Sequence, residues 1–218
     1  MFLASASSFA YRCRVPATPA VTSVITLHKT GEDEQAALSL AERIFPDAAV
    51  IAPRGDVEEG TRLRFFARAP DGLFDREGWA RAGRRLVDFA EDICRPGERR
   101  SPLLFGVSHG ANTALAALVT DPLRFSGALL IRPAPLPKNT SAPDMSGLPI
   151  LLISGSKDRT VPLEQSEGLV AVLSDAGARV EREIVVAGHQ VDETDISLAR
   201  TWWSTRAEAG ANATGEGS

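Results

Sequence analysis

The residue of this chain that is best suited to catalysis is a serine with a glycine two positions before it and another two positions after it. Residues 103–115 read as an apolar run, then Gly106-Val107-Ser108-His109-Gly110, then alanine- and leucine-rich residues that favour helix. A strand, a sharp turn and a helix in this order form a nucleophile elbow, which exposes the serine hydroxyl above a sheet. Side chains two positions before and after the serine would collide in so tight a turn, so glycine fits at both positions. Ser108 is therefore the candidate nucleophile.

An acid and a base follow the serine along the chain. A serine hydroxyl is a weak nucleophile unless a base accepts its proton, and the base needs an anionic partner that fixes its tautomer. Asp158 comes in the loop after the apolar segment 149–154, and His189 comes after the strand-like segment 179–186. Because the carboxyl ends of parallel strands meet at one edge of a sheet, the three side chains should converge. We interpret Ser108, Asp158 and His189 as a catalytic triad.

The acid and the base each have a structural alternative. Asp158 alone fits a turn residue or a helix cap, and a single loop histidine is more often incidental than catalytic. The other downstream aspartates that we considered are Asp144, Asp175, Asp192 and Asp195. None of these directly follows a strand while preceding the His189 loop, and His189 is the only histidine downstream of the elbow helix. Three positional requirements met together favour the triad.

A serine hydrolase also needs donors for the oxyanion of its tetrahedral intermediate. The backbone N–H of His109, the residue after the nucleophile, points into the same space as the serine hydroxyl. The second donor should come from the loop after Leu27, where the Thr30 N–H is the best candidate. We assign His28 a structural role in this loop, because His189 already fills the position of the base.

Composition excludes several other classes of protein. The net charge of −4, with the arginines between residues 54 and 100 mixed with acids, gives no electrostatic case for nucleic-acid binding. Cys13 and Cys94 lie far apart and the three histidines are scattered, so we expect free thiols and no metal site. No dinucleotide-binding or phosphate-binding glycine motif is present, and we expect no cofactor.

The chain is expected to be cytoplasmic. No stretch approaches the length of a membrane span. The mildly apolar residues 1–6 lack the basic region and the long apolar run of a signal peptide.

Strand-like and helix-like segments alternate along the chain. The predicted strands are 9–15, 21–27, 48–52, the elbow strand, 126–131, 149–154 and 179–186. The predicted helices are 33–44, 76–94, the elbow helix to about residue 121, 163–176 and 191–206. This alternation predicts an α/β fold: one mostly parallel central sheet of about seven strands with helices on both faces. We expect a single domain over 1–207 and a disordered tail over 208–218.

Two long connections are candidate walls of a substrate pocket. Residues 54–75 appear irregular and rich in Arg, Gly and Phe, and residues 132–148 form a proline-rich loop. The pocket candidates outside the second loop are Arg64, Phe65, Phe66 and Trp79, although the aromatic rings fit the core equally well. Near the end of the last helix, Trp202 and Trp203 fit either the core or a homodimer contact, and core packing is favoured.

Several motifs accompany the elbow and can be compared with known proteins. They are Leu27-His28 with Thr30-Gly31 and Asp33-Glu34, Ala52-Pro53-Arg54-Gly55, Arg64-Phe65-Phe66 with Arg68, Gly72 with Phe74-Asp75, Asn112, Gly155 with Asp158 and Val161-Pro162, and Gly188-His189. With these motifs the chain, from about residue 9 to Trp203, resembles the phospholipase/carboxylesterase family of α/β-hydrolases. The Arg-Phe-Phe segment is typical of one bacterial branch. The resemblance implies hydrolysis of carboxylic esters through an acyl-enzyme, with Ser108, Asp158 and His189 as the triad.

The chain departs from the family in the oxyanion loop. Where the family usually reads His-Gly-x-Gly-Gly-Asp, this chain has Lys29 and Glu32 in place of two glycines. A side chain there could reshape the loop or narrow the pocket, and an ion pair between Lys29 and Glu32 could brace it. The related dienelactone hydrolases carry cysteine at the elbow, so Ser108 argues against that activity.

We predict a serine carboxylesterase that acts on a small-molecule ester with a small to medium acyl chain. The nearest alternative is a lysophospholipase or acyl-protein thioesterase. These enzymes need a long apolar groove, and this chain has few residues beyond the minimal fold with which to build a lid. A further alternative is a catalytically weak binding protein, if Lys29 and Glu32 spoil the oxyanion hole.

Overall fold

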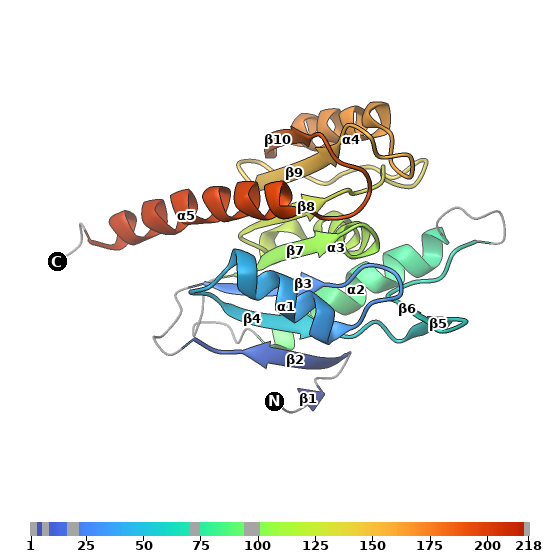
Figure 1. Ribbon diagram of the computed structural model, residues 1–218, viewed down its shortest axis with the longest axis horizontal. Helices are drawn as coiled ribbons and strands as arrows, with labels where there is room; N and C mark the ends of the chain where they lie inside the picture. The colour runs from blue at the N-terminus through green and yellow to red at the C-terminus, as the bar shows by residue number, and fades with distance from the viewer. Residues whose placement is uncertain (1–3, 6–8, 17–21, 70–74, 94–100, 216–218) are drawn as a thin grey trace.

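The fold is built on one twisted sheet of eight strands. The computed structural model describes residues 4–5, 9–16, 22–69, 75–93 and 101–215. The strand order is β1-β2-β4-β3-β7-β8-β9-β10 (Figure 1). Six of these strands are parallel to one another: β3 (Ser23–Leu27), β4 (Ala49–Pro53), β7 (Leu103–Val107), β8 (Gly127–Ile131), β9 (Pro149–Gly155) and β10 (Arg179–Val185).

Two antiparallel strands extend one edge of the sheet. Strand β2 (Ala10–Arg14) pairs with β4, and the two-residue strand β1 (Ala4–Ser5) pairs with β2. The prediction of a mostly parallel sheet of about seven strands is confirmed. Strand β1 was not predicted, because two residues carry no recognisable periodicity.

Helices cover both faces of the sheet. Helices α1 (Glu34–Ile44) and α5 (Glu193–Gly215) lie on one face. Helices α2 (Arg76–Ile93), α3 (His109–Thr120) and α4 (Leu163–Asp175) lie on the other, and the short 3-10 helix η1 (Pro122–Arg124) follows α3.

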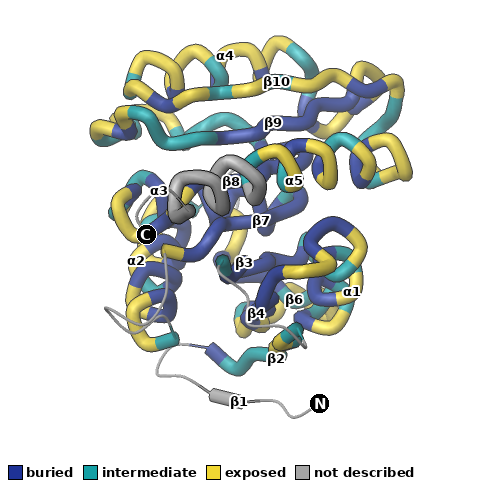
Figure 2. The backbone as a smooth tube through the Cα atoms, turned by 90° about the vertical axis from the view of Figure 1, so that its left-hand side faces the viewer, coloured by how far each residue is buried: buried dark blue, intermediate teal, exposed yellow. Residues whose placement is uncertain are grey.

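Burial explains why the central strands have almost continuous apolar sequences. Strands β3, β4, β7 and β8 are buried along their whole length because helices cover both of their faces (Figure 2). Strand β10 lies at the edge and is largely exposed. Two apolar cores result, one on each side of the sheet.

Two predictions about local structure were wrong. Within the segment 54–75, strands β5 (Val57–Glu59) and β6 (Arg62–Arg64) form a small hairpin, which turns at Gly60 with φ of 65°. Strands this short and charged give no alternation that a sequence can reveal. Helix α5 continues to Gly215, beyond the predicted helix end near residue 206.

Other expectations are only partly addressed by the described residues. Cys13 is an exposed free thiol, whereas Cys94 lies outside the described residues. Among the helices of the described residues, none has the length and apolarity needed to cross a membrane. The domain limits of 1–207 and the cytoplasmic location stay predictions.

The parallel strands bring the candidate site together. His28 follows β3, Ser108 follows β7 and Arg132 follows β8. Asp158 and His189 lie in the loops after β9 and β10. All five residues therefore lie at the carboxyl edge of one sheet, where ligands bind in folds of this kind.

Candidate active site

The sharp turn at Ser108 is enforced by close backbone packing. Ser108 has φ of 51° and ψ of −113°, a backbone conformation that residues other than glycine rarely adopt. A Cβ on Gly106 would lie 2.5 Å from the backbone nitrogen of Ala111, and a Cβ on Gly110 would overlap the carbonyl oxygen of Leu27. Both glycines are therefore sterically required, as the sequence predicts.

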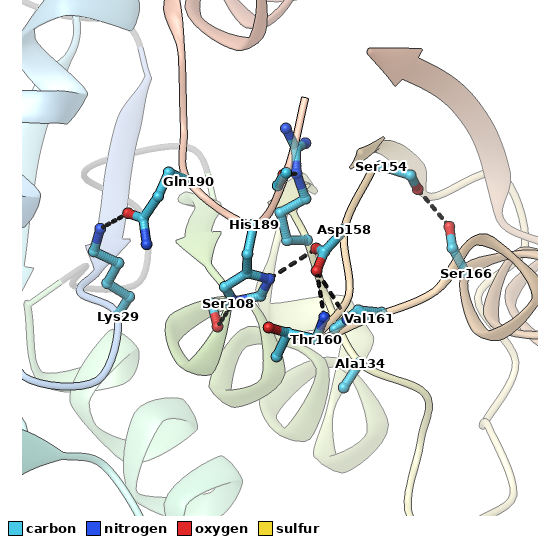
Figure 3. A network of polar contacts seen from close by, with 12 residues as sticks. Lys29, Ser108, Ala134, Ser154, Asp158, Thr160, Val161, Ser166, His189 and Gln190 are labelled. Atoms are coloured by element: carbon cyan, nitrogen blue, oxygen red, sulfur yellow. Dashed lines mark hydrogen bonds and ion pairs between the residues drawn. The ribbon is translucent and has the colours of Figure 1, made fainter. Parts of the chain in front are cut away.

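Ser108, His189 and Asp158 form a continuous chain of hydrogen bonds (Figure 3). The Oγ of Ser108 lies 2.8 Å from Nε2 of His189, and Nδ1 of His189 lies 2.7 Å from Oδ2 of Asp158. With neutral imidazole these partners favour the tautomer in which Nδ1 donates to Asp158 and Nε2 accepts from the hydroxyl. His189 can therefore receive the hydroxyl proton.

Asp158 is held as a carboxylate by its surroundings. Burial raises the pKa of Asp158, but hydrogen bonds from the Val161 N–H, from His189 and from the Thr160 N–H outweigh it and lower the pKa overall. The two backbone donors lie 3.0 and 2.8 Å from Oδ1, which leaves Oδ2 for His189. At neutral pH an anion thus faces the imidazole.

The loop after β3 is held by the ring of His28. Its Nδ1 lies 2.9 Å from the carbonyl oxygen of Lys29, and its Nε2 accepts the backbone N–H of Gly55 at 3.0 Å. Burial lowers the pKa of His28, so the ring is neutral. These contacts agree with the structural role assigned to His28 from the sequence.

Lys29 and Glu32 form the ion pair that the sequence suggests. Lys29 Nζ lies 3.2 Å from Oε1 of Glu32 and donates to Oε1 of Gln190 at 2.7 Å. The second contact joins the loop after β3 to the residue next to His189 (Figure 3). The two substituted positions therefore brace the loop and link it to the loop that carries the base.

Arg64 lies beneath the loop, not in an open pocket. Its side chain is only 2% exposed. Its Nη1 donates to the Thr30 hydroxyl at 2.9 Å, its Nε donates to the Phe66 carbonyl at 3.0 Å, and its Nη2 lies 3.1 Å from Nδ1 of His109. Arg64 thus ties the β5–β6 hairpin to both the loop after β3 and the elbow.

The ring of His109 is a buried, neutral connector. Burial, and then the nearby Arg64 guanidinium, lower its pKa well below the ordinary value. The backbone N–H of Phe65 donates to its Nε2 at 2.9 Å, which makes Nε2 the acceptor nitrogen of the neutral ring. Only the backbone of His109 was singled out from the sequence, because burial of its ring depends on a hairpin that the sequence did not reveal.

The three aromatic pocket candidates are buried. Phe65, Phe66 and Trp79 are 2%, 1% and 4% exposed and belong to the core on the α2–α3 face. Trp79 Nε1 donates to the Asn112 carbonyl, and the Asn112 side chain accepts the Ala134 N–H at 2.8 Å. Their burial agrees with core packing, the alternative that the sequence left open for these rings.

Two site-neighbouring residues were not identified from the sequence. Arg132 and Asp195 form a fully buried ion pair, with side chains 1% and 0% exposed. Asp195 was rejected as the acid of the triad, and its carboxylate binds Arg132 while Asp158 binds His189. A charged residue directly after strand β8 was the one signal that could have drawn attention to Arg132.

The described residues contain no group of three or more His, Cys, Asp and Glu side chains suited to a metal ion. The groups that meet at Ser108 are its hydroxyl, the imidazole of His189 and the carboxylate of Asp158, which backbone amides hold. These are the functional groups that acyl transfer by a serine nucleophile requires.

Comparison with known proteins agrees with this class of enzyme. The sheet order and the strand–turn–helix elbow are those of an α/β-hydrolase, and solved carboxylesterases share the fold. One from Mesorhizobium loti is 27% identical, with a TM-score of 0.86, covering 93% of this chain and 97% of that one. One from Bacillus cereus is 25% identical, with a TM-score of 0.84, covering 91% and 95%.

Sequence comparison defines the family. Residues 86–206 match the family described as Phospholipase/Carboxylesterase. Over 182 residues the chain is 34% identical to a protein of Bacillus subtilis described as the putative hydrolase MhqD, covering 83% of this chain and 91% of that protein. The chain belongs to the phospholipase/carboxylesterase family, and it is a hydrolase.

Proposed function

We propose that the chain is a serine carboxylesterase that cleaves esters with small to medium acyl groups. The observation that carries the proposal is the hydrogen-bond chain from Asp158 through His189 to the strained Ser108. Ser108 Oγ attacks the ester carbonyl while His189 Nε2 accepts its proton. The imidazolium then returns that proton to the departing alcohol, which leaves an acyl-enzyme. Water, deprotonated by His189, hydrolyses the acyl-enzyme and regenerates Ser108.

The oxyanion that forms in each step needs two donors. We assign these to the backbone N–H groups of His109 and Thr30. His109 is the first residue of helix α3, where backbone N–H groups lack intrahelical partners and the helix dipole favours negative charge. Among the hydrogen bonds of the described residues, none uses either N–H. The Arg64 contact to the Thr30 hydroxyl orients the second donor.

The preference for smaller acyl groups follows from the small number of residues that are available to cover the site. Apart from the β5–β6 hairpin and the loop 132–148, the described connections at the carboxyl edge are short. Little of the chain is left to enclose a long alkyl chain. A lysophospholipase or acyl-protein thioesterase needs such an enclosure.

A panel of nitrophenyl esters of increasing acyl length tests this function. We expect the highest kcat/KM at short to medium lengths, and a loss of at least about 10⁴-fold in Ser108→Ala. Ser156→Ala is the matched control, because Ser156 is an exposed serine in the loop of Asp158. A long-chain optimum would favour the lysophospholipase or thioesterase alternative. No turnover of any ester by the wild-type protein would contradict the proposal.

A further inference from the structure

Arg132 is placed unusually for a charged residue. It follows strand β8 with φ of 54°, and its guanidinium lies buried between the end of β9 and the loop that carries His189. Its Nη1 and Nη2 contact Oδ1 and Oδ2 of Asp195 at 2.8 and 3.0 Å. Its Nε donates to the Gly188 carbonyl at 2.9 Å, and Nη1 also reaches the Ile153 carbonyl at 3.2 Å.

Asp195 extends the contact to the other side of the same loop. Its Oδ2, besides accepting from Arg132, accepts the backbone N–H of Asp192 at 2.9 Å. The Asp192 side chain accepts the N–H groups of Thr194 and Asp195, at 2.9 and 3.2 Å. Asp192 therefore caps helix α5, and the loop ends where the helix begins.

The loop of the base is thus tied at both ends to one buried ion pair. Gly188, directly before His189, is held by Arg132, and Asp192, three residues after it, is held by Asp195. Only the residues 189–191 lie between these two anchors. We infer that Arg132 and Asp195 form a positioning pair that fixes the His189 ring against Ser108. This inference rests on the proposed function, because it assigns the pair to the orientation of the catalytic base.

Energetics favour orientation over stability as the role of the pair. Removing two charges from water costs several kcal/mol per ion, so a buried ion pair is weak evidence of net stabilisation. A bidentate guanidinium–carboxylate contact fixes direction as well as distance. Lysine cannot reproduce it, because an ammonium presents one compact charge instead of a planar fork.

The backbone around the pair is shaped to admit it. A Cβ on Gly155 would lie 2.6 Å from the Gly188 carbonyl oxygen and 2.9 Å from Nε of Arg132. Glycine at this position therefore lets the end of β9, the guanidinium and the loop of the base come together.

The first test removes the pair without leaving one buried charge. We compare the wild type with the double variant Arg132→Met/Asp195→Leu, since replacing both partners by apolar residues often preserves folding. The matched control is Arg43→Gln/Glu193→Gln, which removes an exposed ion pair between helix α1 and the first residue of α5. The readouts are kcat and KM for a short nitrophenyl ester and the rate of inactivation by a fluorophosphonate.

We expect kcat and the inactivation rate of the double variant to fall by roughly 10- to 100-fold, as for a misplaced catalytic group. KM should stay within about twofold, since the pair does not touch the ester. The control should behave like the wild type. Wild-type inactivation rates in a folded double variant would contradict the inference and leave the proposed function standing. A wild-type protein that does not react with the fluorophosphonate would contradict both.

A second variant keeps the test decisive if the double variant does not fold. Arg132→Lys retains a positive charge opposite Asp195 but not the contacts to both of its oxygens and to Gly188. We expect it to lose the sharp downfield proton resonance of His189 Nδ1–H, which reports the hydrogen bond to Asp158. We also expect its kcat to fall while KM is preserved. An unchanged resonance together with an unchanged kcat would overturn the inference.

Discussion

The two sides of Ser108 are held in place by different chemistry. On the side of the base, the His189 loop is tied to the buried ion pair Arg132–Asp195. On the side of the oxyanion loop, the buried cation Arg64 contacts the Thr30 hydroxyl and the ring of a neutral His109, and its one carboxylate partner, Glu59 at 3.6 Å, is exposed. The comparison shows that one flank of a site can be positioned by a fully buried ion pair, and the other by a buried cation together with neutral imidazoles and partly exposed ion pairs. The two flanks should therefore respond differently to mutation and to acid.

The largest loss is expected from breaking the side of the base. In Asp158→Asn the amide keeps the shape of the carboxylate but favours the wrong His189 tautomer. We expect kcat to fall roughly 10⁴-fold with little change in KM. The control is Asp175→Asn, an exposed aspartate at the end of α4. Steady-state kinetics on one ester measure both, and a loss of less than tenfold in Asp158→Asn would contradict the role of Asp158.

A smaller loss is expected from breaking the side of the oxyanion loop. Arg64→Met removes the donors to the Thr30 hydroxyl and the Phe66 carbonyl. Because one oxyanion donor is worth about 10²- to 10³-fold in kcat, a displaced Thr30 N–H should lower kcat by roughly 10²-fold. Arg68→Met, an exposed arginine in the same segment, serves as the control. Equal kcat values for Arg64→Met and the wild type would contradict a role of Arg64 in positioning the Thr30 N–H.

As the pH is lowered, the free energy of unfolding should decrease first through the histidines on the side of the oxyanion loop. The pKa values of His28 and His109 are lowered in the fold, so the unfolded chain binds more protons as the pH falls below 6.5. The free energy of unfolding should then decrease by up to roughly 1.4 kcal/mol per pH unit for each histidine. Asp158 responds with the same sign but in a lower pH range: because its pKa is lowered from 3.8, its contribution to the free energy of unfolding is lost only as the pH falls below about 3.8.

Urea unfolding between pH 7 and 4.5 measures this dependence. We expect His109→Gln to have a shallower pH slope than the wild type, because its contribution to proton uptake on unfolding is lost. An identical slope for His109→Gln and the wild type would contradict the neutral, buried state of His109.

The smallest effect is expected at the contact that joins the two flanks. Lys29→Gly removes the bonds to Glu32 and Gln190 and restores a glycine that is usual in the family. Since Lys29 is partly exposed, the free energy of unfolding should change by at most about 1 kcal/mol. We expect kcat/KM to change only a few-fold. A loss of kcat/KM above tenfold would show that the active conformation of the oxyanion loop depends on Lys29.

The two flanks also differ in how far the sequence predicts them. Ser108, Asp158 and His189 were located because each follows a strand, and strand order alone brings their loops to one edge. The steric need for Gly106 and Gly110 was also predictable, since it is local to the turn.

Long-range burial was not predictable from the sequence. Arg64 seemed a pocket residue, because nothing in the short charged segment around it shows that the hairpin folds under the loop after β3. Arg132 and Asp195 meet across 63 residues, and neither lies in a periodic pattern that reveals the other. Pairings of this kind depend on how the finished sheet places its loops.

Site mapping of a covalent fluorophosphonate adduct tests the central claim most directly. The native protein and Ser108→Ala would be treated under the same conditions, digested and analysed by mass spectrometry. We predict one adduct on the native protein, on the peptide that contains Ser108, and none on Ser108→Ala. An unlabelled native protein, or an adduct that persists at the same level in Ser108→Ala, would contradict Ser108 as the nucleophile.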